Sequence, residues 1–427
     1  MELEVNAKQD DFFAHLKSLF ELQDPSDSLA KLRFKSWDHF EEIGLPHRKS
    51  ETFQYIPLNK LFAKRFSLPE PTSLNVEEAI LPECKTSVIV FFNGQLDLTK
   101  SNVSGLPSKV VCIPLKEALK SFGSFINNQL VKGIQEETDP FAILNAAFIQ
   151  KSLFFYVPPG VILSAPLQIL HVINGKNQWL SPRVDFFCGA LSEINVIASM
   201  QHGESVENTI NGVINFTLEE GARCSYSRVL TGSLPSTWHL DATRAVLKKD
   251  SHFTSIIAEN GAEIYRDDYK INLVGSNAEV QLNGIARLYD RQESHTHVLI
   301  EHQAPECRSL QLFKNALEDG SKASFGGKIY VHKIAQKTAA FQLNNNLLLS
   351  EGAESNSKPN LEIFADDVQA SHGATFGSID EDGLFYLRSR GFSKESAKNL
   401  LVQGFCLEVI NKIRLPSLLK QAKDKLL

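Results

Sequence analysis

A long series of short apolar runs, beginning near Leu153, constrains the fold of this chain more than any other feature. Each run is rich in Val, Ile, Phe and Leu and is closed by Gly, Asn, Asp or Ser, as in SLFFYVPPG, EINVIASM and YKINLVGSNA. The pattern continues to about residue 377 without a convincing helical period. Apolar runs of this kind, separated by turn residues, predict β-strands.

Three architectures use many short strands: a sandwich, a propeller and a parallel β-helix. The series is longer than one usual sandwich, and no propeller-blade motif recurs at a fixed period. The small turn units EEGARC, ENGAEI and GSNAEV recur instead, and they place Gly221, Gly261 and Asn277 where a positive φ is easiest. A stacked coil of short strands therefore fits the pattern best.

Helical patterns precede the strand series. DDFFAHLKSLFELQ and SLAKLRFKSWDHFEEIG carry apolar residues at near-helical spacing, and Gly44 is expected to stop the second helix. Residues 115–134 predict a further helix, and Asp139 before Pro140 predicts an N-cap with proline in the first turn. SVIVFFNG interrupts this region as a predicted buried strand. Residues 1–152 are therefore expected to form an N-terminal, mostly helical domain.

Helical patterns also follow the strand series. Ser378 and Glu381 have the spacing of a capping box, and Gly391 is placed to end that helix in a left-handed conformation. Ser393 is expected to open a second helix, which Pro416 interrupts. Three domains are thus predicted: residues 1–152, a β core over 153–377, and a C-terminal helical domain over 378–427.

Composition excludes several classes of protein. The 43% of hydrophobic residues suffices for a large core, while 44 basic and 50 acidic residues give a net charge of -6 and no electrostatic attraction for nucleic acid or anionic lipid. No apolar run approaches the roughly 20 residues that span a bilayer. The acidic start, MELEVNAKQDDFF, does not resemble a secretory signal, so we expect a cytoplasmic protein.

The cysteine spacing and the common enzyme motifs do not indicate a disulfide framework, a zinc site or a nucleotide site. The six cysteines are scattered without CxxC spacing, which predicts reduced, mostly buried thiols. GSKASFGGKIY lacks the first glycine and the Ser or Thr of a phosphate loop, and GxSxG, HExxH and GxGxxG are absent. Asp366 and Asp367 suggest a carbohydrate-active β-helix enzyme, but neighbouring strand residues point to opposite faces. A turn or solvated role is favoured for at least one of them.

Three histidines could ligate a metal. His295 and His297 share one strand face, but no third ligand is visible, and an ordinary surface ladder is the favoured interpretation. His372 follows the two aspartates. On a strand continuing from Leu361 it would lie roughly 20 Å from Asp366, so its co-ligands would have to come from another turn of the coil or another protein. A hydrogen-bonded histidine before a turn is the alternative.

The residues around His372 carry a family resemblance. The stretch AQKTAAFQLNNNLLLSEGAESNSKPNLEIFADDVQASHGATFGSIDEDGLFYLRSRGFSKESAKNLLVQGF resembles the C-terminal signature of the SufB/SufD family of iron-sulfur cluster assembly proteins. GLPHRKSETFQY, DPFAILNAAF and YVPPGVILSAPLQILHV resemble the family more weakly, and together these segments cover most of the chain. The missing cysteine in the late strands indicates the SufD type. Ala370 stands where many SufD sequences carry a cysteine.

The resemblance implies a fold and a function. It implies a right-handed parallel β-helix, flanked by helical termini, that acts as a non-catalytic scaffold. The expected partners are a SufB-type paralogue, paired through the β-helix, and a SufC-type ABC ATPase bound to the C-terminal helices; homodimers are an alternative when the chain is alone. His372 becomes a candidate ligand for iron or a nascent cluster, held transiently and shared with the partner. The implied ATPase-docking residues are Leu384, Phe385, Tyr386, Arg388 and Arg390.

Overall fold

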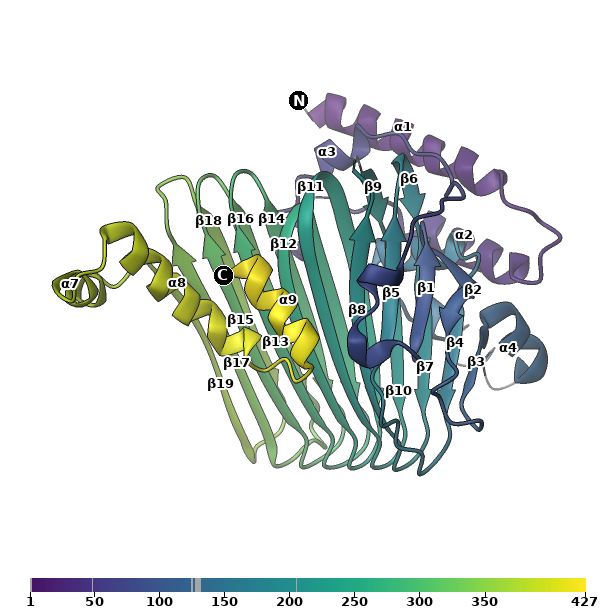
Figure 1. The fold of residues 1–427 in the computed structure, drawn as a ribbon. Coiled ribbons are helices and arrows are strands. Elements are labelled where there is room, and N and C mark those ends of the chain that lie inside the picture. Colours follow the sequence, from purple (N-terminus) through teal and green to yellow (C-terminus); the bar gives the residue numbers. More distant parts are fainter. Residues whose placement is uncertain (1, 48, 124–125, 127–131, 205) are drawn as a thin grey trace.

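The computed structural model describes residues 2–47, 49–123, 126, 132–204 and 206–427, and places helices on both sides of a continuous strand series (Figure 1). The series is preceded by α1 (Glu2–Glu21), α2 (Ala30–Ile43), η1 (Glu51–Phe53), α3 (Leu58–Phe62), η2 (Glu77–Ala79), η3 (Pro82–Cys84), β1 (Val88–Phe92), β2 (Gln95–Asn102), β3 (Val111–Pro114), α4 (Leu115–Ser121) and α6 (Pro140–Ala147). The series consists of β4 (Leu153–Val157), β5 (Leu167–Ile173), β6 (Lys176–Leu180), β7 (Arg183–Cys188), β8 (Glu193–His202), β9 (Glu207–Ile210), β10 (Val213–Leu218), β11 (Arg223–Leu247), β12 (His252–Leu273), β13 (Glu279–Leu288), β14 (Glu293–His302), β15 (Arg308–Leu317), β16 (Lys322–Val331), β17 (Thr338–Leu348), β18 (Glu354–Ile363) and β19 (Val368–Gly377). It is followed by α7 (Glu381–Ser389), α8 (Lys394–Ile410) and α9 (Pro416–Leu426).

The strands form two parallel ladders. One ladder runs through β5, β8, β11, β12, β13, β15, β17 and β19. The other runs through β4, β7, β10, β11, β12, β14, β16 and β18. From β13 onward the chain alternates between the ladders, so each strand pairs with the strand one turn away. In its described residues the chain thus forms a β-solenoid of about eight turns, and the predicted parallel β-helix with helices at both ends is confirmed.

Apolar side chains fill part of the solenoid interior. Phe155, Phe186 and Phe216 lie above one another on successive turns, with ring centroids 5.3 Å and 5.1 Å apart, and Phe253 from the other ladder packs against Phe216 at 4.9 Å. Such a column arises because inward side chains at paired register positions lie directly above one another. This packing favours the observed register of these three strands.

A charged cluster occupies another part of the interior. Arg228 is 5% exposed and lies 2.8 Å from Asp241 and 2.9 Å from Glu259, and it also contacts Asp267. Burial raises the pKa of Glu259 well above its ordinary value, with the charge of Asp267 acting in the same direction. These groups compensate one another, because a buried charge without a partner would be costly.

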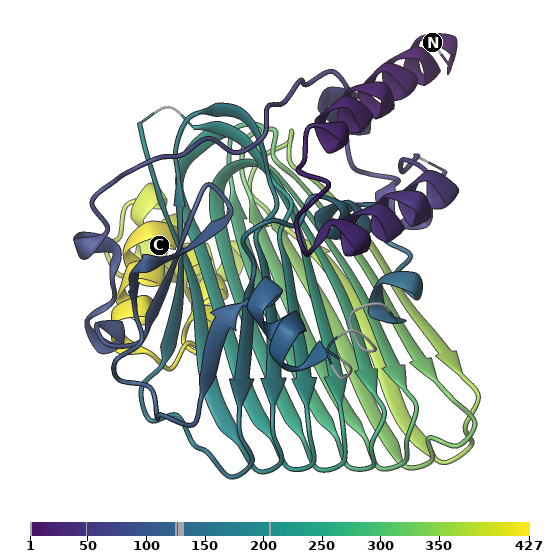
Figure 2. The same cartoon turned by 90° about the vertical axis from the view of Figure 1, so that its right-hand side faces the viewer.

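Helices cover the outside of the solenoid. α8 contacts β13 and β15, α9 contacts β11 and β12, and Val402, Val409 and Leu418 are buried in this contact. The strands lie side by side along the solenoid in Figure 2, with the C-terminal helices on one wall and α1 and α2 on the other side. Among the described residues, no helix is both long and apolar enough to cross a bilayer.

Several predicted helix boundaries are confirmed. α2 ends before Gly44, which has a φ of 77°. The Asp139 carboxylate accepts hydrogen bonds from the backbone N–H groups of Phe141 and Ala142, which caps α6. Ser393 caps α8, and Gly391 adopts a φ of 96° after α7.

Other local predictions need correction or remain predictions. The capping box of Ser378 and Glu381 is wrong, because Asp380 is the N-cap of α7 and its carboxylate accepts a hydrogen bond from the N–H of Asp382 at 3.2 Å. Gly261, expected in a turn between strands, lies within β12 with a φ of 102°. The helix predicted over 115–134 begins as α4, but part of it lies outside the described residues.

The start of the sheet precedes residue 153. β1 pairs with β5 in parallel and with β2 in antiparallel register, so the predicted strand SVIVFFNG belongs to the solenoid sheet. The domain boundaries at residues 152 and 378 stay predictions.

Candidate functional site

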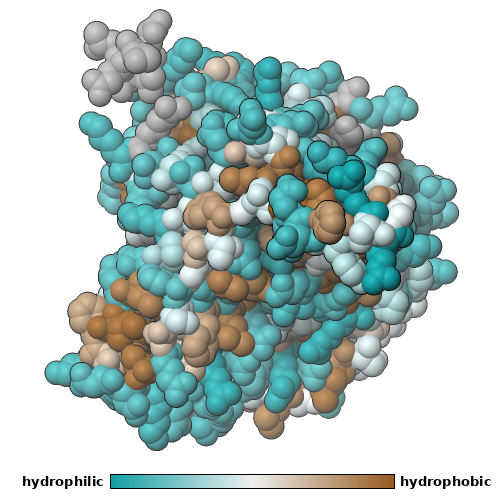
Figure 3. All heavy atoms as spheres, turned by 90° about the vertical axis from the view of Figure 1, so that its left-hand side faces the viewer, coloured by the Kyte–Doolittle hydropathy of each residue, from teal (hydrophilic) through white to brown (hydrophobic). Residues whose placement is uncertain are grey.

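The solenoid ends in two strands that each have a neighbour on one side. β18 pairs with β16 and β19 pairs with β17, and no other strand of the described residues extends either ladder. The last turn lies at the left of Figure 1, and Figure 3 faces that side of the molecule. Unpaired strand edges present backbone N–H and C=O groups that can pair with another chain.

His372 lies on this last turn. It is exposed and pairs in register with Gln342, which is 3% exposed and faces the solenoid interior. Paired positions on neighbouring parallel strands face the same side, so His372 also points to the inner side. It is exposed because no further turn covers it. The open end therefore presents an imidazole to any protein that docks there.

The two aspartates lie away from the strand that carries His372. Asp366 and Asp367 are exposed in the turn between β18 and β19, where the N–H of Asp367 donates to the Gln336 side chain at 2.9 Å. The chain bends at this turn, so the assumption of a straight strand from Leu361 is wrong. Among the described residues, no three His, Cys, Asp or Glu side chains converge to hold a metal. This chain thus brings no ready-made ligand set to His372.

Amide side chains line the interior just inside the open end. The Gln342 amide donates to Gln311 at 3.0 Å, Asn346 donates to Asn344 at 2.8 Å, and Ser355 donates to Asn346 at 2.8 Å. Sequence reasoning missed this polar lining. Its signal is the period of two in QLNNN, which places Gln342, Asn344 and Asn346 on one strand face.

α7 extends beyond the solenoid and presents most of the predicted docking residues (Figure 1). Phe385 is 74% exposed and Tyr386 is 56% exposed, and the Arg390 guanidinium lies 5.1 Å from the Tyr386 ring. Arg388 is also exposed. Leu384 is only 6% exposed, so most of its side chain packs within the protein.

His295 and His297 share the outer face of β14 as expected, but in different environments. His295 is 4% exposed and contacts Ser324 at 2.8 Å and Glu293 at 3.1 Å, so it is a buried, hydrogen-bonded histidine rather than part of a surface ladder. His297 is partly exposed and contacts Asp268 at 2.8 Å.

The cysteines are reduced, as predicted, and five of the six are buried. Burial raises the pKa of Cys84 and of Cys112 to about 12. Because the thiolate is the form that binds iron, these thiols are poor ligands in the folded chain.

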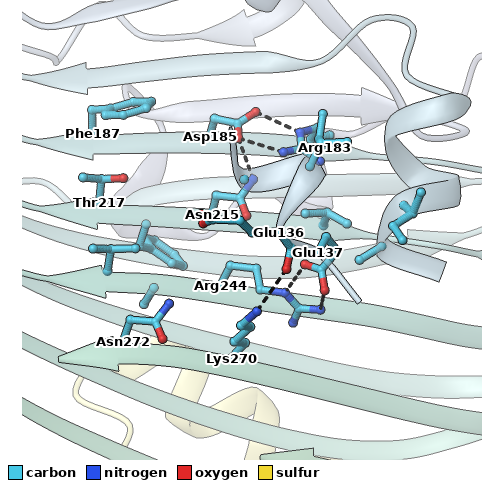
Figure 4. A pocket seen from close by; sticks show the side chains of 18 residues that line it. Glu136, Glu137, Arg183, Asp185, Phe187, Asn215, Thr217, Arg244, Lys270 and Asn272 are labelled. Carbon is cyan, nitrogen blue, oxygen red and sulfur yellow. Dashed lines mark hydrogen bonds and ion pairs between the residues drawn. The ribbon is translucent and has the colours of Figure 1, made fainter. Parts of the chain in front are cut away.

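A pocket of about 190 Å³ lies on the outer face of the sheet beside the segment that leads into α6 (Figure 4). Its charged groups contact one another. Arg183 lies 3.1 Å from Asp185, Arg244 lies 2.7 Å from Glu137, and the Asn215 amide donates to Asp185 at 2.6 Å. This mutual pairing indicates a structural role, attaching the segment to the sheet.

Comparison with known proteins agrees with this architecture. Residues 171–405 match the family model described as SUF system FeS cluster assembly, SufBD core domain, and residues 4–169 match the SufBD protein N-terminal region. An iron-sulfur cluster assembly SufBD family protein of Synechocystis is 30% identical over 89% of this chain and 86% of its own length. SufD of Escherichia coli is 27% identical over 88% of both chains, and SufB of Bacillus subtilis is 22% identical over 87% of this chain and 83% of its own. With its solenoid and both family regions matched, the chain belongs to the SufBD family of iron-sulfur cluster assembly proteins.

Proposed function

We propose that this chain is a SufD-type, non-catalytic scaffold subunit of a SufBCD-type complex that assembles iron-sulfur clusters. The observation that carries the proposal is the open end of the solenoid, where two unpaired strand edges and the exposed His372 lie together. A SufB-type subunit with the same fold would dock its own open end there. The higher identity to SufD than to SufB, 27% against 22%, supports the SufD assignment.

His372 is proposed to hold iron, or a nascent cluster, at this interface. A neutral imidazole suits ferrous iron, whereas iron-sulfur clusters need thiolate ligands. The thiols of this chain are mostly buried and their burial disfavours the thiolate. The soft ligands are therefore assigned to the SufB-type partner, and the cluster is transient cargo shared between the two chains.

The remaining partners are assigned to α7 and to the open end of the solenoid. α7 is proposed to dock a SufC-type ABC ATPase through Phe385, Tyr386, Arg388 and Arg390. Without a SufB-type partner, the same open end would pair with a second copy of this chain. The proposal keeps the cytoplasmic location expected from the sequence.

The central experiment is coexpression with SufB-type and SufC-type proteins, anaerobic purification and metal analysis. His372→Ala should leave the complex assembled, because the side chain is exposed, and should remove most of its iron and acid-labile sulfide. His332→Ala is the control, since His332 is a partly exposed histidine, with 39% of its side chain exposed, in the turn after β16 and outside β19. Its complex should keep the wild-type iron content.

Two results would contradict this proposal. Unchanged iron and sulfide in the His372→Ala complex would make the chain a purely structural subunit. Failure of the wild-type chain to copurify with either partner would remove the scaffold function itself.

A further inference from the structure

A second cavity, of about 80 Å³, lies on the outer face of the ladder that contains β14, β16 and β18. We call it the histidine pocket. One wall is the N-terminal segment around η1, with Glu51 and Tyr55, and the floor is the strand surface. Its volume is well above the roughly 15 Å³ that one water molecule needs, so it can hold a small polyatomic group. The pocket faces outward and is separate from the inward-facing His372.

The strand register places a buried acid directly beside one of the histidines that line this pocket. Asp268 on β12 pairs with His297 on β14, and the His297 Nδ1 lies 2.8 Å from the Asp268 carboxylate. Burial alone would raise the pKa of Asp268, but Arg244, Arg266 and His297 lower it below its ordinary value. An ionised carboxylate only accepts hydrogen bonds, so Nδ1 carries the proton that it donates. Nε2 is then the nitrogen left for a ligand, and it donates to an anion in the imidazolium form, in which both ring nitrogens carry a proton.

The next position in the register leaves room for that ligand. His297 pairs with Gly326 on β16, which pairs in turn with Lys358 on β18. A Cβ atom at Gly326 would lie 3.5 Å from the Cδ2 of His297, an ordinary contact distance, and Gly326 has no positive φ. The glycine is therefore not required by the backbone conformation. Its missing side chain opens the space beside Nε2.

The charged side chains that line the pocket are mostly basic. The lining residues include the basic Arg266, His295, His297, Lys328 and Lys358, whereas Glu51 is the acidic one among the described lining residues. Each of these bases already contacts a carboxylate, so an incoming anion has to displace one of those partners.

Two of these basic groups, Lys328 and Lys358, can exchange their present partners for a bound anion at low cost. Lys328 pairs with Glu362 at 2.7 Å and Lys358 with Glu51 at 2.7 Å, and all four side chains are between 37% and 63% exposed. Exposed ion pairs contribute little stability, so an incoming anion can compete for both lysines.

Arg266 adds a buried positive charge behind the pocket. It is 1% exposed, contacts Asp139 and lies 3.2 Å from Asp268, and the Phe53 ring centre lies 4.5 Å from its guanidinium carbon. Its Nε and Nη1 atoms donate no hydrogen bond to any described residue. Buried donors without a partner are costly, and Arg266 lines the pocket, so an acceptor bound there would lie close to unsatisfied donors.

We propose that the histidine pocket binds a small oxyanion group, a phosphate or a carboxylate, between Lys328, Lys358 and the Nε2 of His297. The sequence alone suggested for His297 a place in a surface ladder or, with His295, a metal ligand. Register makes Asp268 and Gly326 its neighbours from one turn away in the chain and brings Lys358 near from two turns away. The inference is independent of the proposed cluster scaffold, because it concerns a different face and does not involve iron.

The test is isothermal titration calorimetry of the full chain with inorganic phosphate and, separately, with acetate. We expect saturable binding of at least one anion at one site per chain. Phosphate-selective binding would identify a phosphorylated ligand, and acetate-selective binding a carboxylate. Gly326→Leu, which fills the pocket, and Lys328→Gln, which removes a charge, should each weaken binding at least about tenfold, or about 1.4 kcal/mol.

Lys322→Gln is the matched control. Lys322 also lies on β16 and pairs across to β18, at 2.8 Å from Glu354, but it does not line the pocket. Its substitution should leave the affinity unchanged. The proposal fails if neither anion gives saturable binding up to about 10 mM, or if Lys328→Gln and Lys322→Gln have equal effects. If Gly326→Leu does not fold, the two lysine variants decide the question alone.

Discussion

At the scale of single residues, burial distinguishes the histidines of this chain from one another. His372 is exposed at the open end, whereas His302 is 0% exposed inside the solenoid. The His302 Nε2 lies 2.9 Å from the Ser309 hydroxyl, and its Nδ1 is buried without a partner. Burial lowers the pKa of His302 to about 4. His302 is thus neutral in the folded protein at neutral pH.

This burial predicts an acid-dependent loss of stability. The unfolded chain binds a proton at His302 near its ordinary pKa of about 6.5, whereas the folded chain binds it only near 4. The stability is therefore complete above pH 6.5 and declines as the pH falls toward 4. His302 should make the protein about 2 kcal/mol less stable at pH 5 than at pH 7. Urea unfolding at both pH values measures this difference.

The His302→Gln variant isolates this contribution, because glutamine does not titrate. Other groups also titrate in this range, so the comparison is between the pH dependences of the wild type and the variant. The difference between their slopes belongs to His302. Parallel stability curves between pH 5 and pH 7 would show that burial does not shift this histidine.

At the scale of elements, α7 differs from α8 and α9 in what it packs against. α8 and α9 bury apolar side chains such as Val402 and Leu418 against the solenoid, whereas α7 mainly contacts α8. Deletion of all residues after Ser378 would therefore also uncover part of the core. Substitutions on the exposed side of α7 are the cleaner test of docking.

The double variant Phe385→Ala with Arg388→Glu should abolish copurification with a SufC-type ATPase. Phe385 is 74% exposed, and interface energy concentrates in aromatic and arginine side chains. The thermal midpoint of the isolated chain should stay unchanged, because neither side chain is buried. Leu400→Ala is the control, since Leu400 is an apolar residue of α8 that is 44% exposed. ATPase retention by the double variant would place the docking surface elsewhere.

At the scale of the whole molecule, the solenoid is closed at one end and open at the other. The N-terminal segment contributes β1 beside β5, whereas β18 and β19 end their ladders without a cover. The last turn also exposes an aromatic side chain, Phe376, at 51%. Exposed edges and apolar side chains together favour association with another solenoid.

A charge at the open end should block this association. Phe376→Lys should shift the SufB-type complex, and any homodimer, to free chains, because burying an unpaired charge costs roughly 3–5 kcal/mol. Leu310→Lys is the control, since Leu310 lies on β15, away from the last turn, and is 42% exposed. Sedimentation analysis measures both. A stable Phe376→Lys complex would mean that the chains do not meet at this end.

Local patterns predicted much of this molecule. The strand series, the caps at Asp139 and Ser393, and the left-handed Gly391 all depend on residues close together in the chain. The capping box at Ser378 failed because Asp380, two residues later, offers a competing carboxylate at the start of α7. Local signals of similar strength cannot be ranked without the surrounding packing.

The sequence by itself determined the class of fold, the helical ends and the unusual His372, because periodicity, turn residues and motifs are properties of neighbouring residues. Only the tertiary structure decided which turns lie beside one another. In the folded chain His295 is buried, His297 lies between Asp268 and Gly326, and His372 lies on the last turn, which no further turn covers. The physical reason is register: a parallel ladder joins residues a full turn apart, and a shift by one residue would move every side chain to the opposite face.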